Sequence, residues 1–148
     1  MQRGNKLKIA TWNVERLKSK NKVSEIIENS KSIAADIFVF TETDFTVKFG
    51  YEFHAETLYP ANTLAVYEET ERRVAIQTNY EIIQQYDTFN NETAVCVELK
   101  TDNGILLVYG VVIGILGNRH KSFMPDLLSV KSDIYNLSKE NNNLCIWG

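Results

Sequence analysis

The sequence contains little cysteine, proline or glycine and no long hydrophobic run. Its 148 residues include 2 Cys, 2 Pro and 7 Gly, a composition that excludes collagen-like chains, low-complexity chains and small disulfide-linked scaffolds. The longest apolar stretch, residues 105–116, is interrupted by Gly110 and Gly114. A membrane-spanning helix needs about 20 apolar residues, so this stretch predicts a buried strand, and we expect no membrane partner.

Positive charge is not in excess either. The chain carries 16 Lys and Arg against 19 Asp and Glu, a net charge of −3, and its isoelectric point is near 5.4. These values argue against a protein that binds nucleic acid mainly through a broad basic face. They are still compatible with a phosphate substrate, because a bound metal ion can supply positive charge locally.

The N-terminal residues Met1–Lys8 do not contain the apolar core of a secretory signal. We therefore expect a cytoplasmic protein. Cys96 and Cys145 each lie within an apolar segment, and in that compartment they are expected to be reduced, buried thiols.

The rest of the composition is that of an ordinary globular domain. Hydrophobic residues make up 44% of the chain and charged residues 24%. A chain of this length can bury about 70% of the surface that its unfolded form exposes. No internal repeat and no linker interrupts the pattern, which predicts one mixed α/β domain over residues 1–148.

The start of the chain has the pattern of a strand, a helix and a second strand. Residues 7–12 alternate between two faces, as in a half-buried strand. Apolar residues at helical spacing predict a helix near residues 22–34, capped by Asn21 or Ser24. Ile37–Phe40 is a continuous apolar run, typical of a strand covered on both faces. Together these elements predict a right-handed crossover between two parallel strands.

The middle of the chain has the pattern of successive strands. The candidates are Tyr51–His54, Thr63–Tyr67, Arg72–Thr78, Glu81–Tyr86, Ala94–Thr101 and Ile105–Ile113. The last two flank Asp102-Asn103-Gly104, a hairpin signal because Asn-Gly accepts positive φ at both central positions. A second helix is expected near residues 124–140, with Pro125 in its first turn, and a last buried strand over Leu144–Trp147.

The same pattern predicts which residues are buried. The apolar stripe of the second helix is expected to consist of Leu127, Leu128, Lys131, Ile134, Tyr135 and Leu137. The core is expected to centre on Ile9, Ile37, Val39, Ala75, Val95, Val97, Leu107, Val108, Val111 and Ile146. Exposure of most of these residues would mean that the predicted strand register is wrong.

Polar residues or glycine follow three of the apolar strands at the point where each strand ends. Asn13 and Glu15 follow the first strand, Glu42 follows the second, and Gly148 follows the last. Where strands run parallel, ligands collect outside their carboxyl ends. An amide and a carboxylate from neighbouring strand ends, together with waters and phosphate oxygens, suit Mg²⁺ or Mn²⁺.

Each of these polar residues also has a simpler interpretation. Taken alone, Asn13 is a turn residue after a strand, and Glu42 is equally well a ligand or a solvated carboxylate. Glu15 and Asp44 have the pattern of solvent-facing charges.

Three further polar features have no partner at ligand spacing. His54 and His120 are isolated and are interpreted as surface or hydrogen-bonded histidines. Asn118–Lys121 is polar and cationic and follows an apolar strand. We interpret it as a solvated loop, with phosphate binding as the alternative.

Taken jointly, these segments resemble the endonuclease/exonuclease/phosphatase superfamily. The matching stretches are Lys8–Val14, Asp36–Glu42, Arg72–Ile76, Leu106–Gly110 and Leu144–Gly148. The first two are fairly specific, and the others are strand segments that fit the family in order and separation. The resemblance covers essentially the whole chain but only the first part of the family domain, a little over half.

The resemblance implies a four-layer α/β sandwich, in which two mostly antiparallel sheets pack face to face with helices outside. It implies a hydrolase that cleaves phosphodiester or phosphomonoester bonds with Mg²⁺ or Mn²⁺, most simply a nuclease acting on nucleic acid. In that arrangement Asn13 lies beside the metal and the scissile phosphate, and Glu42 is a direct metal ligand. Glu15 is a weaker candidate for an acidic residue near the metal.

The chain departs from the family pattern mainly at its end. Family members continue from the glycine that Gly148 matches into Asp-x-Asn and later carry Ser-Asp-His, and neither motif follows here. Thr41 stands where many members have Gln, and Val111–Gly114 lacks the Tyr and Asn common in family nucleases. We therefore expect residues 1–148 to be the N-terminal portion of the domain, with the metal side of the site and little activity alone.

Two other hypotheses stay open at this point. The chain could be a truncated, non-catalytic binding module that pairs with a second copy or another chain through a sheet edge at Leu144–Trp147. It could also be one half of a split enzyme, in which a separate polypeptide supplies the missing motifs.

Overall fold

The computed structural model describes the backbone of residues 6–61, 63, 65–114, 119–140 and 144–147, and the side chains of all of these except 119, 120, 140 and 144–147. The strands are β1 (Ile9–Asn13), β2 (Ile37–Asp44), β3 (Phe53–Glu56), β4 (Glu71–Thr78), β5 (Glu81–Tyr86), β6 (Ala94–Thr101), β7 (Gly104–Val111) and β8 (Leu144–Trp147). The α-helices are α1 (Val23–Ile33) and α2 (Arg119–Glu140). Two short 3-10 turns, Glu15–Leu17 and Lys20–Lys22, join β1 to α1.

The first sheet contains the predicted crossover between parallel strands. Its strand order is β1-β2-β4-β3. β1 pairs with β2 in parallel, from Ile9 opposite Ile37 to Asn13 opposite Thr41, and α1 connects the two strands. β4 pairs antiparallel with both β2 and β3. The carboxyl ends of β1 and β2 therefore lie side by side at one edge of this sheet.

The second sheet is a meander closed by a parallel strand. Its order is β5-β6-β7-β8, antiparallel except for the parallel pairing of β7 with β8. The β6–β7 hairpin turns where Asp102-Asn103-Gly104 predicted it, with Thr101 opposite Gly104. Of these turn residues only Gly104 has a positive φ, +113°. The expectation of positive φ at both central positions was therefore wrong, and the glycine alone takes the unusual conformation.

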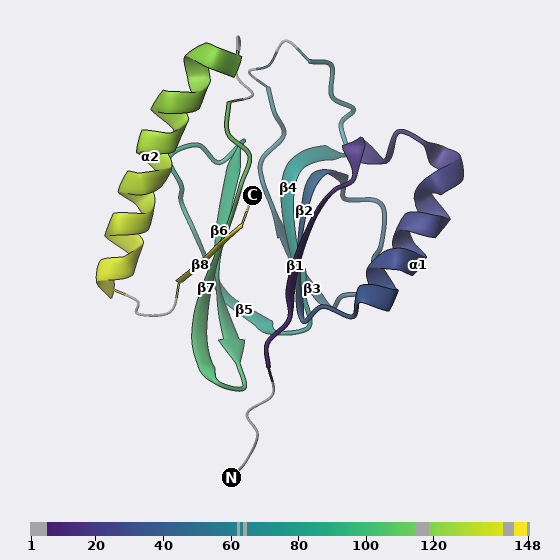
Figure 1. Cartoon of the computed structure of the whole chain (residues 1–148), viewed down its shortest axis with the longest axis horizontal. Coiled ribbons are helices and arrows are strands. Elements are labelled where there is room, and N and C mark those ends of the chain that lie inside the picture. The colour runs from purple at the N-terminus through teal and green to yellow at the C-terminus, as the bar shows by residue number, and fades with distance from the viewer. Residues whose placement is uncertain (1–5, 62, 64, 115–118, 141–143, 148) are drawn as a thin grey trace.

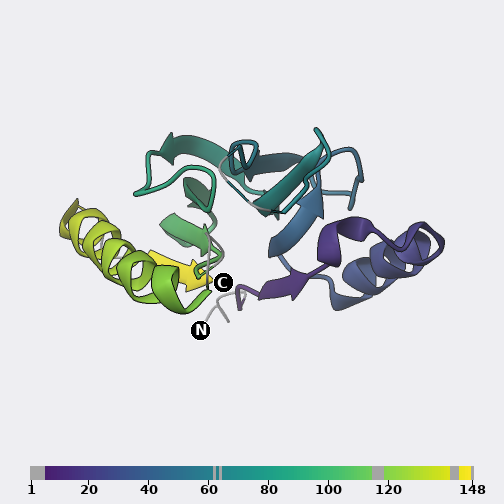
Figure 2. The ribbon, with the colours of Figure 1, turned by 90° about the horizontal axis from the view of Figure 1, so that it is seen from above.

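The two sheets pack face to face, and one helix covers each outer face (Figures 1 and 2). Residues of both sheets form the central core. Phe38 and Phe40 of β2 face the α1 side, whereas Cys96, Tyr109 and the α2 residue Val130 share a third cluster. This arrangement confirms the α/β sandwich with mostly antiparallel sheets.

Asp133 attaches α2 to the second sheet. Its Oδ2 accepts hydrogen bonds from the Tyr109 hydroxyl at 2.6 Å and from the Phe89 backbone N–H at 2.7 Å. Burial raises the pKa of Tyr109 far above its usual value, and the bond to Asp133 adds to that effect. Tyr109 is therefore a structural donor and stays protonated.

The predicted core is confirmed except at Ile9 and Ile146. The buried members are Ile37, Val39, Ala75, Val95, Val97, Leu107, Val108 and Val111. Ile9 is only partly buried and packs against the central core, because β1 has a partner strand on one side in the described sheet. The side chain of Ile146 lies outside the described residues.

The helices differ from the sequence expectation at their starts. α1 begins at Val23 with Lys22 as N-cap and no side-chain capping bond, so neither predicted capping residue acts as one. α2 already begins at Arg119, and Pro125 lies inside it. The expected solvated loop is thus helical from Arg119 onward, and the prediction of Pro125 in the first turn was wrong. A proline inside a helix removes one backbone donor and disfavours the helix locally, so the observed start of α2 is not one that local propensity predicts.

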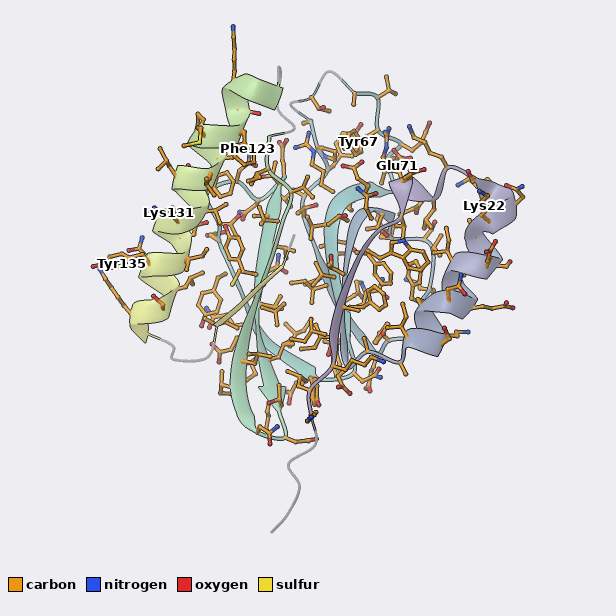
Figure 3. The ribbon with its side chains drawn as sticks, viewed as in Figure 1. Lys22, Tyr67, Glu71, Phe123, Lys131 and Tyr135 are labelled. Atoms are coloured by element: carbon orange, nitrogen blue, oxygen red, sulfur yellow. The ribbon has the colours of Figure 1, made fainter. Side chains whose placement is uncertain are left out.

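The stripe prediction for α2 was partly wrong as well. Leu127, Ile134 and Leu137 are half-buried as predicted, whereas Leu128, Lys131 and Tyr135 are exposed. The buried residue of this face is Val130, which the prediction omitted. Figure 3 shows Tyr135 on the side of α2 that faces away from the sheets. The predicted strand Thr63–Tyr67 is also absent, since its described residues are irregular. None of the described helices has both the length and the apolar character needed to cross a membrane.

Candidate active site

Asn13, Glu15 and Glu42, the three predicted site residues, line one cavity of ≈ 640 Å³. Asn13 is the last residue of β1 and pairs with Thr41, the neighbour of Glu42. The cavity lies at the edge where the parallel strands end. Its lining residues are Asn13, Glu15, Arg16, Lys18, Glu42, Thr63, Ala65, Tyr67, Val112, Ile113 and Gly114. The structure thus brings both strand ends together with the segment that follows β7.

The backbone of Glu42 is unusual within a strand. Its φ is +52°, in the left-handed region that L-residues avoid. The β2–β4 register continues on both sides of it, with Thr41 opposite Val74 and Thr43 opposite Arg72. Thr41 and Asn13 line a pocket that adjoins the cavity, whereas Thr43 and Phe45 line a pocket on the opposite, outer face of the sheet. Such local outliers concentrate at functional sites.

The Glu42 carboxylate has two partners in the cavity. The Tyr67 hydroxyl lies 3.1 Å from each of its oxygens, and Arg16 Nε lies 3.4 Å from Oε2. The Glu42 side chain is 19% exposed and that of Arg16 is 14% exposed. Burial raises the pKa of Tyr67 above its usual value, and the Glu42 charge contributes to the rise. The phenol is therefore the proton donor to Glu42.

Arg16 connects four parts of the chain. Its NH1 group donates to the Val66 carbonyl at 2.6 Å and lies 3.3 Å from Glu71 Oε2, and its guanidinium lies 4.6 Å from the centre of the Tyr67 ring. Figure 3 shows Tyr67 and Glu71 close together at this end of the first sheet. Glu71 is buried, so the ion pair with Arg16 also compensates its charge.

A second arginine approaches the same tyrosine from β4. Arg73 is fully buried, and its guanidinium carbon lies 5.5 Å from the Tyr67 ring centre. Among the described residues no hydrogen-bond partner is present for its Nε, NH1 or NH2 atoms. The contact with the Tyr67 ring is the interaction that offsets the burial of this charge.

Asn13 and Glu15 are both exposed at the cavity edge. The Asn13 side-chain oxygen accepts a hydrogen bond from the Glu15 backbone N–H at 2.9 Å, which is the turn role that the simpler interpretation gave it. Glu15, Arg16 and Leu17 all have positive φ, +51°, +56° and +53°. This left-handed turn directs the chain away from β1 and places Arg16 over the cavity.

Other candidate residues lie elsewhere or serve the fold. Asp44 was predicted to face solvent, but it is buried and accepts hydrogen bonds from Thr46 and Thr70. It therefore shapes the turn after β2, and the prediction was wrong. His54 is exposed on β3 and lines a pocket on the outer face of its sheet. The side chain of His120 lies outside the described residues.

The oxygen donors at this edge fit a hard divalent cation. Glu42 and Glu15 offer carboxylates and Asn13 an amide, and Mg²⁺ binds through few protein oxygens and retained waters. Within the described ranges no group of three or more His, Cys, Asp or Glu could hold a metal ion. Any metal here would therefore use these few side chains with waters and substrate oxygens.

Three residues that shape the candidate site were not identified by the sequence analysis. Arg16 and Tyr67 both contact Glu42, although they lie far from it along the chain. Asp126 of α2 accepts a hydrogen bond from the Gly114 N–H at 2.9 Å and so fixes the wall formed by Val112–Gly114. The only local signal was the charge of Arg16, directly after the Asn-Val-Glu stretch.

Comparisons by sequence find no relative, because no protein-family model and no curated protein matches the chain. Solved structures do match the fold. The endonuclease domain of TRAS1, a telomere-specific non-LTR retrotransposon, is 15% identical with a TM-score of 0.60, covering 94% of this chain and 58% of its own. The 3′ phosphatase NExo from Neisseria, bound to a product DNA hairpin, is 14% identical with a TM-score of 0.64, covering 95% and 56%.

A third match is a mutant beta toxin from Staphylococcus aureus with bound magnesium ions. It is 19% identical with a TM-score of 0.51, covering 71% of this chain and 48% of its own. The chain thus spans about half to three fifths of the length of these proteins. At this identity the matches show the fold alone, which this chain shares with an endonuclease domain and with a 3′ phosphatase.

Proposed function

We propose that this chain carries the metal side of the active site of a divalent-metal-dependent phosphoesterase, most simply a nuclease. The observation that carries the proposal is the shared cavity of Asn13 and Glu42, which come from neighbouring parallel strands at their carboxyl ends. Ligands collect at this place in parallel α/β arrangements. The proposal agrees with the phosphatases and nucleases among the solved structures of this fold.

Glu42 and Asn13 are the residues that would hold Mg²⁺ or Mn²⁺, with Glu15 at the edge of the site. When bound, the metal ion would polarise a phosphoryl oxygen and neutralise charge on the leaving oxygen. Tyr67 orients the Glu42 carboxylate through its hydroxyl group. Asn13 offers an amide donor that can bind a phosphate oxygen without adding negative charge.

The matched solved structures also support a proposal for the class of substrate. NExo is described with a DNA hairpin and TRAS1 as an endonuclease, so we propose a phosphoester in a nucleic acid. A metal ion would have to neutralise the phosphate, because the chain as a whole has a net charge of −3.

We further propose that residues 1–148 are the N-terminal portion of the catalytic domain. By the resemblance, the groups that activate water and bind the phosphate come from Asp-x-Asn and Ser-Asp-His, which these residues do not contain. Loss of such groups lowers a rate by about 100-fold or more each. The chain by itself is then expected to hydrolyse phosphodiesters very slowly.

A partner-dependent role is the second candidate. In the described part of the second sheet, β8 pairs only with β7, so its other edge can accept a strand from another segment or a second copy. A dimer that buries this edge, or activity restored by mixing in a polypeptide with the missing motifs, would favour this role. A well-behaved monomer that gains nothing from such a polypeptide would weaken it.

Hydrolysis of bis-p-nitrophenyl phosphate and of plasmid DNA tests the proposal. The slow activity expected of this chain should require Mg²⁺ or Mn²⁺, disappear with EDTA, and fall to the uncatalysed background in Glu42→Ala and Asn13→Ala. Glu81→Ala is the matched control, because Glu81 is an exposed glutamate at the start of β5. Robust activity that Glu42→Ala leaves unchanged would contradict the site assignment.

A further inference from the structure

Arg16 forms an ion pair with the Glu42 carboxylate, the group that the proposed function assigns to a metal ion. Its Nε atom lies 3.4 Å from Glu42 Oε2, and both side chains are mostly buried. Oε2 also receives the Tyr67 hydroxyl at 3.1 Å. The guanidinium therefore provides the positive charge that Glu42 needs in the absence of a cation.

The position of Arg16 does not depend on Glu42 alone. The Val66 carbonyl and Glu71 Oε2 both bind its NH1 group, and the Tyr67 ring lies 4.6 Å from its guanidinium carbon. The left-handed turn with φ of +56° at Arg16 directs its side chain to this place. If the contact with Glu42 is lost, the guanidinium still has three partners: the Glu71 carboxylate, the Val66 carbonyl and the Tyr67 ring.

We propose that Arg16 is an internal counter-ion of Glu42 that a divalent cation must displace. This inference rests on the proposed function, because it takes Glu42 to be the metal ligand. A metal ion at Glu42 Oε2 and the Arg16 Nε–H group would compete for one oxygen and repel each other in a partly buried site. Part of the binding free energy of the metal is then used to break this pair.

Arg16 therefore sets the metal affinity of the site, and its removal should tighten metal binding. Arg16→Gly is the cleanest variant, because glycine adopts a φ of +56° without strain. Arg16→Gln is the second variant, since it keeps the length of the polar side chain but removes the charge. Lys18→Gln is the matched control, because Lys18 is an exposed cation that lines the same cavity.

The experiment is a titration of the 148-residue chain with Mn²⁺, followed by electron paramagnetic resonance of the free ion. We expect Arg16→Gly and Arg16→Gln to bind Mn²⁺ about tenfold more tightly than the parent chain, as for removal of a competing partner. Lys18→Gln removes a screened, exposed charge and should change the affinity by less than about threefold. Circular dichroism of each variant verifies that it is folded.

Two results separate the inference from the proposed function. If Glu42→Gln abolishes Mn²⁺ binding but neither folded Arg16 variant tightens it, the counter-ion role is overturned and the metal site stands. If Mn²⁺ binding is the same with and without the Glu42 carboxylate, the metal-site assignment itself fails. If the Arg16 variants bind Mn²⁺ more tightly, and adding Glu42→Gln to them abolishes that binding, the result supports both the counter-ion role of Arg16 and the metal site at Glu42.

Discussion

The hydroxyl group of Tyr67 lies 3.1 Å from both carboxylate oxygens of Glu42. One O–H group thus bridges the two acceptors, and the ring that carries it is in contact with two arginines. A loop residue thereby holds a strand residue whose backbone has a left-handed φ of +52°. The geometry of the candidate site depends on this contact between loop and strand.

Tyr67→Phe should lower the free energy of unfolding by about 1 kcal/mol, because it removes a hydrogen bond to a partly buried carboxylate and leaves the ring in place. Urea denaturation measures the change. Tyr135→Phe is the control, since Tyr135 is 62% exposed, and its stability should stay within about 0.5 kcal/mol of the parent chain. Equal effects of the two substitutions would contradict a role for the Tyr67 hydroxyl.

Gly110→Ala should destabilise the packing of the two sheets. A Cβ atom at Gly110 of β7 would lie 2.8 Å from Val74 Cγ1 and 3.1 Å from Val39 Cγ1, both in the first sheet. Overpacking of this kind costs about 1–3 kcal/mol, measured as the loss of free energy of unfolding in urea.

The double variant Gly110→Ala/Val74→Ala tests the cause of that loss. Val74→Ala removes the atom that conflicts with the new methyl group, so the double variant should be more stable than the sum of the single effects predicts. Strict additivity would show that the cost of Gly110→Ala comes from the backbone instead.

The stability of the protein should fall in acid because of Asp44. Burial alone would raise the pKa of this carboxyl, but hydrogen bonds from Thr46 and Thr70 outweigh burial and bring the pKa below the usual 3.8. The unfolded chain therefore takes up this proton at higher pH than the folded chain. Stability from Asp44 is fully present above about pH 4 and is lost as the pH falls through the folded-state pKa.

Urea denaturation of the parent chain and of Asp44→Asn, from about pH 6 to about pH 2.5, measures the contribution of Asp44 to the pH dependence of stability. The difference in free energy of unfolding between the two proteins should shrink as the pH falls. Asp102→Asn, at the exposed tip of the β6–β7 hairpin, should leave the pH dependence unchanged. A difference between parent and Asp44→Asn that stays constant across the range would rule out the carboxylate as its source.

Cys96 should be unreactive in the folded protein. The thiol is buried, and burial raises its pKa to about 12. Because the thiolate is the nucleophile, iodoacetamide near neutral pH should leave the Cys96 peptide unmodified in the native protein and alkylate it in urea. Peptide mass spectrometry follows this site separately from Cys145. Rapid native alkylation at Cys96 would contradict the burial of β6.

The strand and core predictions succeeded where the pattern is local and periodic. Ile37–Phe40 became the buried centre of β2, and the Asp102-Asn103-Gly104 turn became the β6–β7 hairpin. Apolar alternation and helical spacing record which side of an element is buried. Failures occurred where local signals conflict with tertiary contacts. Pro125 marks a helix start by its chemistry, yet α2 continues around it.

The residues of the candidate site also divide into those that local sequence signals predict and those that they do not. Asn13 and Glu42 could be predicted because Asn13 ends β1 and Glu42 comes shortly after the apolar run of β2, and the parallel pairing of β1 and β2 brings these ends together. Glu15 is in the cavity for the same reason. Asp44, two residues beyond Glu42, carries the same kind of charge and has a purely structural role, because Thr46 and Thr70 surround it.

The sequence by itself determined the order of most elements, most of the faces they bury and the two strand-end residues, Asn13 and Glu42, that meet in the candidate site, because these depend on periodicity and on neighbours in the chain. Only the tertiary structure decided what surrounds Glu42. Tyr67 lies 25 positions from Glu42, and Arg16 lies 55 positions from Glu71. Contacts at such separations arise from the packing of β2, β4 and two irregular segments, and no local pattern encodes them.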